Sequence, residues 1–333
     1  MHMKMPWPGR RRSGPTATVR PNRSIARWAP ASRLPAKSGE QLMTSTDQSP
    51  FAGANALIFG GAKGIGRCVA LEWARRGARL AVADIDEDAA KATAAEIAAA
   101  GGEAVGLAAN VMSEESIAAA IAAAEAALGE IDILMNNVGG ILNGHPEDVP
   151  MREWQRIMEL NYLGSARATT QMLPKFLARG RGYLVNTASF AGFYPYAASR
   201  IPYAASKAAV IAMTESLALY CEPLGVRVAC LIPGPVATGV MDTMTSWTEN
   251  CPMRGPGKET TLMLPEAVAT VLADGMRDGR ILIPSDDVAF DVVKRWAESP
   301  DDFIRAKIAE FESGDRGNPI VPEAILAAMG AKK

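Results

Sequence analysis

From Asn55 onward, the chain alternates between short apolar runs and long, Ala-rich amphipathic stretches. Apolar runs this short are typical of parallel strands that helices cover on both faces. Because crossovers between parallel strands are right-handed, the alternation predicts a single α/β domain with a doubly wound, seven-stranded parallel sheet. The expected strands lie within residues 56–59, 79–83, 104–107, 131–135, 183–186, 226–232 and 281–283. The expected helices lie near residues 64–76, 86–100, 113–128, 151–179, 202–223 and 265–278.

The two ends of the chain differ from this alternating part. Residues 1–50 are rich in Arg, Pro and Ser and lack periodicity, so we expect a disordered basic extension. Three interpretations of it stay open: a passenger ahead of a functional start at Met43, a transit peptide, or an arm for nucleic acid or membrane. Residues 51–284 are expected to form the α/β domain. Residues 285–333 are expected to form a helical appendage that docks on the core or on a neighbouring subunit, with helices near 288–298, 301–312 and 322–329.

Charge and composition argue against several classes of protein. Residues 1–42 carry nine basic residues and one acidic residue, whereas the remaining residues carry 26 basic and 35 acidic residues. An acidic body is a poor match for nucleic acid. No stretch approaches the roughly 18–20 apolar residues that a membrane-spanning helix needs. Four cysteines without a CxxC pair and only two histidines argue against a metal site and favour a reducing, cytoplasmic compartment.

A glycine-rich segment follows the first expected strand directly and precedes a helix; it reads Gly60-Gly61-Ala62-Lys63-Gly64-Ile65-Gly66. Glycine allows a sharp turn and a close approach of the backbone to a ligand. The N-terminus of the next helix offers unpaired N–H groups and the positive end of its dipole. These features predict a pyrophosphate-binding turn. A P-loop is disfavoured because Lys63 is not followed by Ser or Thr, and a tight turn with a purely structural purpose is the alternative.

Asp84 ends the second expected strand, 18 residues after Gly66. At about this distance a carboxylate meets the adenosine ribose of a dinucleotide, where it also repels a 2′-phosphate. Asp84 therefore favours NAD over NADP, although the charge of Lys63 would attract that phosphate. The alternative for Asp84 is an ordinary acid at a strand end or a helix cap, and Asp86 could be the cap instead.

Tyr203 and Lys207 lie four residues apart at the start of an expected helix, so they share one helix face. A nearby ammonium favours the phenolate, and we expect Lys207 together with an oxidised nicotinamide to lower the pKa of Tyr203 from its usual value of about 10. Tyr203 would then serve as a general base near neutral pH. Ser189 follows the fifth expected strand, where it could donate a hydrogen bond to a substrate oxygen. If each feature is considered alone, Tyr203 and Lys207 could be an ordinary surface pair, and Ser189 could be a loop serine that caps a turn.

Six motifs in this order resemble those of the short-chain dehydrogenase/reductases, and the resemblance covers residues 52–283. The motifs are the glycine turn with Gly60, Gly64 and Gly66; Asn136-Asn137-Val138-Gly139; Asn161 in Glu159-Leu160-Asn161; Ser189; Tyr203 with Lys207; and Pro233-Gly234-Pro235-Val236-Ala237-Thr238. The resemblance implies a Rossmann-fold, NAD(P)-dependent enzyme that interconverts a secondary alcohol and a ketone.

The resemblance also implies a role for each matched residue. Tyr203 would be the acid/base, Lys207 would bind the nicotinamide ribose, and Ser189 would polarise the substrate oxygen. Asn161 would sit in a helix kink and hold a water molecule of a proton relay. The remaining expected cofactor contacts are Asn110, Val111, Asn137, Gly139, Pro233, Val236 and Thr238. Asn110 departs from the family, which usually has Asp at this position near the adenine.

Two segments are expected to frame the substrate, namely 190–202 and 236–264. The candidate substrate contacts within them are Phe193, Tyr196 and Met241. The second segment is long and rich in methionine, as a mobile lid would be, and methionine adapts to irregular apolar ligands. We therefore expect an apolar or aromatic secondary alcohol or ketone as substrate. Packing in the core or in a subunit interface is the alternative for these side chains.

Analogy with the family predicts a homodimer or homotetramer formed by the helices expected at 151–179 and 202–223. Three alternatives to an NAD-dependent dehydrogenase stay open: an NADP-dependent carbonyl reductase, a non-redox reaction on the same fold, and a nucleotide sensor without turnover. Sensors of this kind usually lose the tyrosine or the lysine, and both are present here.

Overall fold

The computed structural model describes residues 49–239 and 244–330. The basic extension predicted for residues 1–50 therefore lies almost entirely outside the described residues, as does Met241. In the described part, no helix is long and apolar enough to cross a membrane.

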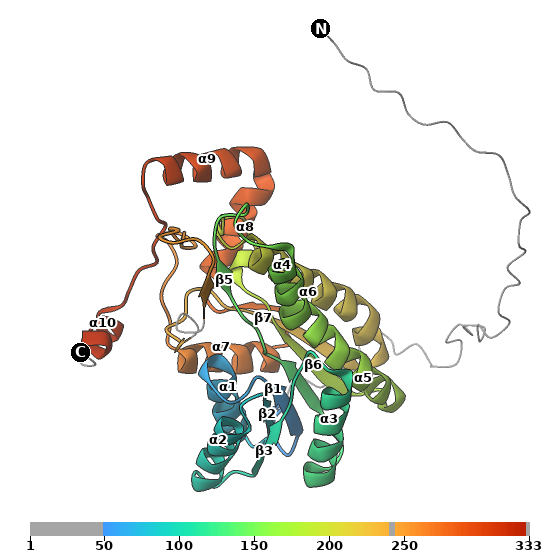
Figure 1. The fold of residues 1–333 in the computed structure, drawn as a ribbon. Helices are drawn as coiled ribbons and strands as arrows, with labels where there is room; N and C mark the ends of the chain where they lie inside the picture. Colours follow the sequence, from blue (N-terminus) through green and yellow to red (C-terminus); the bar gives the residue numbers. More distant parts are fainter. Residues whose placement is uncertain (1–48, 240–243, 331–333) are drawn as a thin grey trace, which may run out of the picture. The chain divides into compact units, whose positions relative to one another are not determined.

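Seven parallel strands form the central sheet, in the order β3-β2-β1-β4-β6-β7-β9 (Figure 1). Their bounds are β1 Asn55–Phe59, β2 Arg79–Asp84, β3 Ala104–Ala108, β4 Ile133–Asn136, β6 Gly182–Thr187, β7 Val226–Ile232 and β9 Leu282–Pro284. Each falls on a predicted apolar run, and the doubly wound α/β prediction is confirmed. The order reverses between β1 and β4, so the crevice for a ligand opens beyond the carboxyl ends of these strands.

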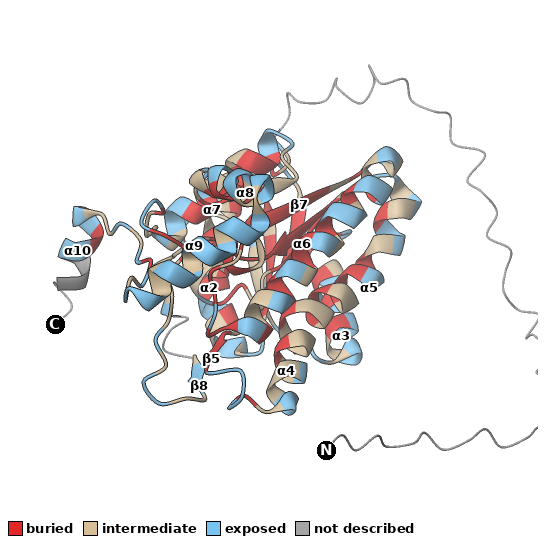
Figure 2. Ribbon diagram, turned by 90° about the horizontal axis from the view of Figure 1, so that it is seen from above, coloured by how far each residue is buried: buried red, intermediate tan, exposed pale blue. Residues whose placement is uncertain are grey.

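Helices cover both faces of the sheet and enclose two separate apolar cores (Figure 2). Successive side chains of a strand point to opposite faces, so Ile58 joins one core while Leu57 and Phe59 join the other. The first core is covered by α1 (Gly64–Arg75), α2 (Glu87–Ala99) and α7 (Pro265–Arg277). The second core is covered by α3 (Glu114–Leu128), α5 (Gly164–Arg179) and α6 (Ile201–Cys221).

The helix predicted over 151–179 is interrupted by a π-helical turn. It consists of α4 (Met151–Met158), the π-helix η1 (Glu159–Leu163) and α5. A π-turn adds a residue to the helix and is frequent at functional sites. The apolar residues of so short a π-turn repeat almost as they do in an α-helix, so the sequence pattern does not reveal the π-turn.

Two features outside the main sheet bear on the site. The two-residue strands β5 (Leu142–Asn143) and β8 (Thr245–Ser246) pair in parallel, which joins the loop after β4 to the segment after β7; the sequence did not predict this pair. Beyond β9 follow α8 (Val288–Glu298), α9 (Pro300–Glu312) and α10 (Glu323–Gly330), close to the predicted helices. Ala289 and Val292 of α8 are buried in a third apolar cluster, whereas α9 has no buried residue.

Candidate active site

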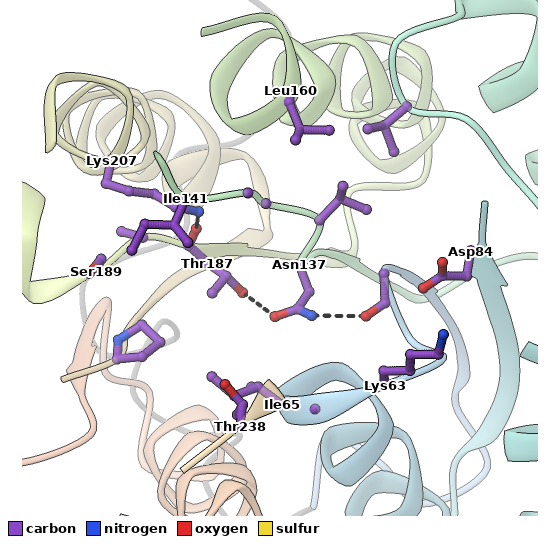
Figure 3. A pocket seen from close by; sticks show the side chains of 18 of the residues that line it. Lys63, Ile65, Asp84, Asn137, Ile141, Leu160, Thr187, Ser189, Lys207 and Thr238 are labelled. Atoms are coloured by element: carbon purple, nitrogen blue, oxygen red, sulfur yellow. Dashed lines mark hydrogen bonds between the residues drawn. The ribbon is translucent and has the colours of Figure 1, made fainter. Parts of the chain in front are cut away.

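A cavity of about 580 Å³ lies at the carboxyl ends of the parallel strands (Figure 3). Residues that directly follow or end β1, β2, β4, β6 and β7 supply much of its wall. The structure brings most of the predicted site residues to this wall. Those that line it are Gly60, Lys63, Gly64, Ile65, Asp84, Asn110, Val111, Asn137, Gly139, Ser189, Tyr203, Lys207, Pro233, Val236 and Thr238.

The glycine turn forms one end of the cavity. Gly60 and Gly64 have φ angles of +78° and +54°, which disfavour residues with a side chain. A Cβ atom at Gly66 would lie 1.9 Å from the carbonyl oxygen of Gly60 and 2.6 Å from Nδ2 of Asn137. Gly66 does not line the cavity. Its missing side chain allows the first turn of helix α1 to pack directly against the Gly60 carbonyl. The helix N-terminus then faces a cradle of bare backbone that suits a pyrophosphate.

Asn137 holds the turn in place. Its Nδ2 donates a hydrogen bond to the carbonyl of Gly60 (2.9 Å), and its Oδ1 accepts one from the Thr187 hydroxyl (3.1 Å) (Figure 3). The side chain thus bridges β1 to β6 across the cavity floor. Thr187 lines the cavity as well, and the sequence analysis missed it because it looked like an ordinary strand residue beside Ser189.

Asp84 and Lys63 lie at the same end of the cavity (Figure 3). Asp84 accepts weak hydrogen bonds from the backbone N–H of Ala62 (3.3 Å) and of Asp86 (3.2 Å), so its carboxylate is oriented by the loop. The Lys63 ammonium contacts the Asp86 carboxylate at 2.7 Å. This hydrogen bond raises the pKa of Lys63 and lowers that of Asp86. Since Asp86 offsets the lysine charge, Lys63 is a poorer attractor for a 2′-phosphate than the sequence alone indicated.

Asn110 and Val111 complete this end of the wall. The Oδ1 atom of Asn110 accepts a hydrogen bond from the N–H of Met112 (3.0 Å), and the residue is exposed. Val111 is buried, and a Cβ atom at Gly164 of α5 would lie 2.9 Å from it. The amide oxygen of Asn110 is therefore already used to form a turn of its own loop.

Ser189 lies at the opposite end of the cavity from Asp84 (Figure 3). Tyr203 also lines the cavity, and its side chain interacts with that of Ser189. Ser189 follows β6, and its hydroxyl accepts a hydrogen bond from the N–H of Ala191 (3.2 Å). Tyr203 lies in the first turn of α6. Burial raises the pKa of Tyr203, while the Ser189 side chain and the Arg200 charge lower it. Burial thus outweighs both favourable groups, and the lower pKa expected when Lys207 acts together with an oxidised nicotinamide stays a prediction.

Lys207 is buried one turn along the same helix face. Its Nζ donates a hydrogen bond to the carbonyl of Thr187 (2.9 Å) and lies 6.0 Å from the centroid of the Tyr203 ring. Burial lowers the pKa of Lys207 to about 8. The ammonium is thus held by one backbone carbonyl at the cavity wall and retains further donors that could meet a ligand.

This burial makes stability depend on pH. Between about pH 8 and 10.5 the unfolded chain binds the Lys207 proton and the folded protein does not, so Lys207 adds stability as the pH rises through this window. A pKa shift of this size corresponds to about 3 kcal/mol. We expect the unfolding free energy of the wild type minus that of Lys207→Met to increase by about this amount from neutral pH to pH 10.5, as measured by urea denaturation. A difference that does not change with pH would mean that Lys207 titrates normally.

Asn161 lies within the π-helix and is fully buried. Its side-chain amide pairs with the backbone of Gly140, accepting from the N–H at 2.8 Å and donating to the carbonyl at 3.0 Å, and it also donates to the Ser206 hydroxyl (2.9 Å). Asn161 thus does not line the cavity but fixes Gly140, which does. A Cβ atom at Gly139 would lie 3.0 Å from Nζ of Lys207, so glycine lets the loop pass close to the lysine.

The predicted substrate contacts are placed differently. Phe193 packs edge-on against Phe290, with ring centroids 5.8 Å apart, and Tyr196 is buried against Tyr194, with centroids 5.3 Å apart. Neither lines the cavity. Both belong to the apolar cluster that anchors α8, which no local pattern could reveal. Apolar wall residues that the sequence analysis missed are Ile85, Met112, Val138, Ile141 and Leu160.

Comparisons with known proteins agree with this geometry. The family model described as short chain dehydrogenase matches residues 54–249. The 2,5-dichloro-2,5-cyclohexadiene-1,4-diol dehydrogenase of Sphingobium indicum is 34% identical over 208 residues, which are 61% of this chain and 83% of that protein. The 1-deoxy-11-beta-hydroxypentalenate dehydrogenase of Streptomyces exfoliatus is 32% identical over 255 residues, 74% of this chain and 90% of that protein.

A solved structure gives the same result. The crystal structure of a short chain dehydrogenase/reductase from Burkholderia phymatum in complex with NAD is similar with a TM-score of 0.67 and 28% sequence identity; the match covers 76% of this chain and 96% of that one. This chain therefore belongs to the short chain dehydrogenase family of oxidoreductases.

Proposed function

We propose that the protein is an NAD-dependent oxidoreductase that interconverts a secondary alcohol and a ketone, with Tyr203 as the acid/base. The observation that carries the proposal is a single cavity with two chemically different ends (Figure 3). Ser189, Tyr203 and Lys207 form one end, and the glycine turn with Asp84 forms the other. A dinucleotide has the length and the chemistry to connect a phosphate cradle with an acid/base site.

The residues present fit NAD. The glycine turn and the N-terminus of α1 would hold the pyrophosphate, and Asp84 would accept hydrogen bonds from the adenosine ribose hydroxyls. Lys207 would bind the nicotinamide ribose, and Thr238 lines the cavity near Ile65. The ion pair between Lys63 and Asp86 supports NAD over NADP because it reduces the positive charge near the ribose.

The protein groups divide the chemistry between them. When bound, the nicotinamide accepts or returns a hydride. Ser189 donates a hydrogen bond to the substrate oxygen and holds it near the Tyr203 hydroxyl. During oxidation the Tyr203 phenolate accepts the hydroxyl proton, and during reduction the phenol returns it. The Ser189 side chain and the Arg200 charge favour the phenolate that burial alone would disfavour. The Lys207 ammonium, 6.0 Å from the centroid of the Tyr203 ring, would add to this effect.

The proposed substrate is an apolar or aromatic secondary alcohol or ketone. Ile141, Leu160 and Val236 give the cavity an apolar wall. Two relatives are named for substrates built on a carbon ring, a cyclohexadiene diol and a hydroxypentalenate. Following NADH formation with aryl, alicyclic, steroid and polyol secondary alcohols tests the proposal. We expect NADH formation with at least one aryl or ring-based alcohol. Faster turnover of polyols would contradict the apolar substrate. No NADH formation with any alcohol of the panel would contradict the proposed reaction.

Asp84 provides a test of cofactor choice. We expect Asp84→Ala to raise the KM for NAD by about tenfold, because the adenosine ribose loses a charge-assisted hydrogen-bond acceptor. The substitution should also reduce the preference for NAD over NADP, because the carboxylate no longer repels a 2′-phosphate. Asp88→Ala is the matched control, since Asp88 lies in the first turn of α2 and does not line the cavity. A wild type that turns over only with NADP, or equal effects of both substitutions, would contradict this role.

A homodimer or homotetramer is the proposed assembly, with the helical segment α4–η1–α5 and helix α6 at the interface. Leu219 and Tyr220 of α6 are 82% and 55% exposed. These two neighbouring apolar side chains would be buried if this part of α6 lay in a contiguous apolar interface, which is the kind of surface that marks a partner site. We expect light scattering to give a dimer or tetramer, and Leu219→Glu to shift it toward the monomer. A wild-type monomer at micromolar concentration would contradict the prediction.

We further propose that the protein acts in the cytoplasm and binds neither nucleic acid nor membrane.

A further inference from the structure

Two segments that are far apart in the sequence lie side by side next to the site. We name residues 251–263, which follow β8, the substrate-side loop. Residues 311–320, which are the last two residues of α9 and the segment after it, are named the C-terminal strap. Their backbones are joined by four hydrogen bonds of 2.7–3.0 Å, namely Gly255 N–H to Arg316 O, Gly257 N–H to Gly317 O, Leu262 N–H to Ile320 O and Ile320 N–H to Thr260 O. A Cβ atom at Gly255 would lie 2.2 Å from the Gly317 oxygen, so the two backbones are in close contact.

Arg254 is the side chain that joins the loop to the strap. Its guanidinium donates hydrogen bonds to the carbonyl of Phe311 (2.9 Å) and to that of Asp315, and it lies 4.5 Å from the centroid of the Phe311 ring. The Phe311 carbonyl lies in the last turn of α9, where a positive charge also interacts favourably with the helix dipole, whereas Asp315 follows the end of the helix. A neighbouring ion pair between Lys258 and Asp315 (2.6 Å) lies at the exposed edge of the same contact.

The backbone of Arg254 reaches the catalytic helix. Its carbonyl accepts a hydrogen bond of 2.5 Å from Nη2 of Arg200. Arg200 is 8% exposed, forms no ion pair with a described acidic residue, and lies at the N-cap of α6, three residues before Tyr203. Its guanidinium also lies 5.5 Å from the centroid of the Tyr196 ring. A buried cation is costly unless its position is held, and here the Arg254 carbonyl holds it.

We propose that Arg254 is a positioning residue: by tying the substrate-side loop to the C-terminal strap, it fixes the carbonyl that keeps Arg200 beside Tyr203. The inference rests on the proposed function of Tyr203. It also assigns a function in the reaction to the end of α9 and the segment after it, because they present the two carbonyls that Arg254 binds. The charged and titratable groups around Tyr203 are then Arg200, Lys207 and Tyr196, and only Arg200 depends on the loop for its place.

The kinetic test compares Arg254→Met with Arg305→Met. Arg305 is an exposed residue of α9 whose only described ion pairs are with Asp301 and Asp302 of the same helix. We expect Arg254→Met to lower kcat/KM for the alcohol by about tenfold, mainly through KM, because the loop and Arg200 lose their fixed places. The KM for NAD is expected to stay unchanged, and Arg305→Met to behave as the wild type. Arg254→Lys keeps the charge and is expected to restore part of the loss.

The pH profile separates positioning from simple stability. Since Arg200 lowers the pKa of Tyr203, its displacement should move the rising limb of alcohol oxidation to higher pH in Arg254→Met. In an Arg200→Met background, the Arg254 substitution should cause no further shift of that limb. A lower melting temperature without any shift of the limb, or an equal shift in the Arg200→Met background, would overturn the proposal.

Hydrogen exchange tests the same contact without activity. The amides of Gly255, Gly257 and Leu262 donate to the strap, and we expect them to exchange faster in Arg254→Met than in the wild type or in Arg305→Met. Unchanged exchange would overturn the proposal. A different result would separate the two proposals: if the wild type oxidises no alcohol but the loop amides still exchange faster in Arg254→Met, the proposed function is contradicted. The contact between the substrate-side loop and the C-terminal strap would then still be supported.

Discussion

Tyr203→Phe is expected to lower kcat by about 10³-fold while leaving the affinity for NAD nearly unchanged. The substitution removes only the hydroxyl that exchanges a proton with the substrate, and the ring keeps its packing at the start of α6. The residues proposed to hold the pyrophosphate and the adenosine lie at the other end of the cavity, so cofactor binding should not depend on this hydroxyl. Steady-state kinetics and titration of NAD by fluorescence measure the two quantities separately.

Tyr183→Phe is the matched control for this substitution. Tyr183 lies in β6 and is buried in the apolar core that α1, α2 and α7 cover. Its hydroxyl donates a hydrogen bond to the carbonyl of Met276 (3.3 Å) in the same core. We expect it to lose some stability but to keep full turnover. Undiminished activity of Tyr203→Phe would show that another group transfers the proton, and equal losses in both variants would show that the effect is structural.

Gly66→Ala is expected to lower the affinity for NAD by at least about 100-fold and the free energy of unfolding by about 1–3 kcal/mol. The new Cβ atom would lie 1.9 Å from the Gly60 carbonyl, so the turn and the start of α1 must separate. That movement also displaces the Nδ2 atom of Asn137, which would be 2.6 Å away, and with it the cavity floor. Isothermal titration with NAD and urea denaturation measure the two effects.

Gly101→Ala controls for the backbone strain of a glycine replacement. Gly101 has a φ of +87°, and a Cβ atom there would meet nothing within 4 Å. It follows α2, away from the cavity wall. We expect a loss of stability without a change in NAD affinity. Normal NAD binding by Gly66→Ala would contradict the pyrophosphate site at the glycine turn.

The fold could be predicted because all strands of this sheet except the edge strand β3 are largely buried on both faces. Such strands appear as short apolar runs, as in Ala56–Phe59 and Val226–Ile232, and Gly and Asp residues mark where they end. The same property explains why so many cavity residues could be predicted. In a parallel sheet all carboxyl ends meet at one edge, so residues such as Asp84 and Ser189 converge there whatever the loops do.

The features that could not be predicted depend on contacts between distant segments. Phe193 and Tyr196 follow Ser189 closely, yet they turn into the cluster that anchors α8, nearly a hundred residues later. The pairing of β5 with β8 and the contact of the strap with the substrate-side loop are equally non-local. The raised pKa of Tyr203 results from burial, which helical spacing between Tyr203 and Lys207 does not reveal.

We propose that a hydride passes between the substrate carbon and NAD at the Tyr203 end of the cavity. The most direct measurement uses the alcohol identified in the panel, with deuterium on its carbinol carbon, and mass spectrometry of the reduced cofactor. We expect the wild type, but not Tyr203→Phe, to form NADH that carries deuterium, in an amount equal to that of the ketone. Product formed without labelled NADH would contradict the claim and would point to a non-redox reaction on this fold.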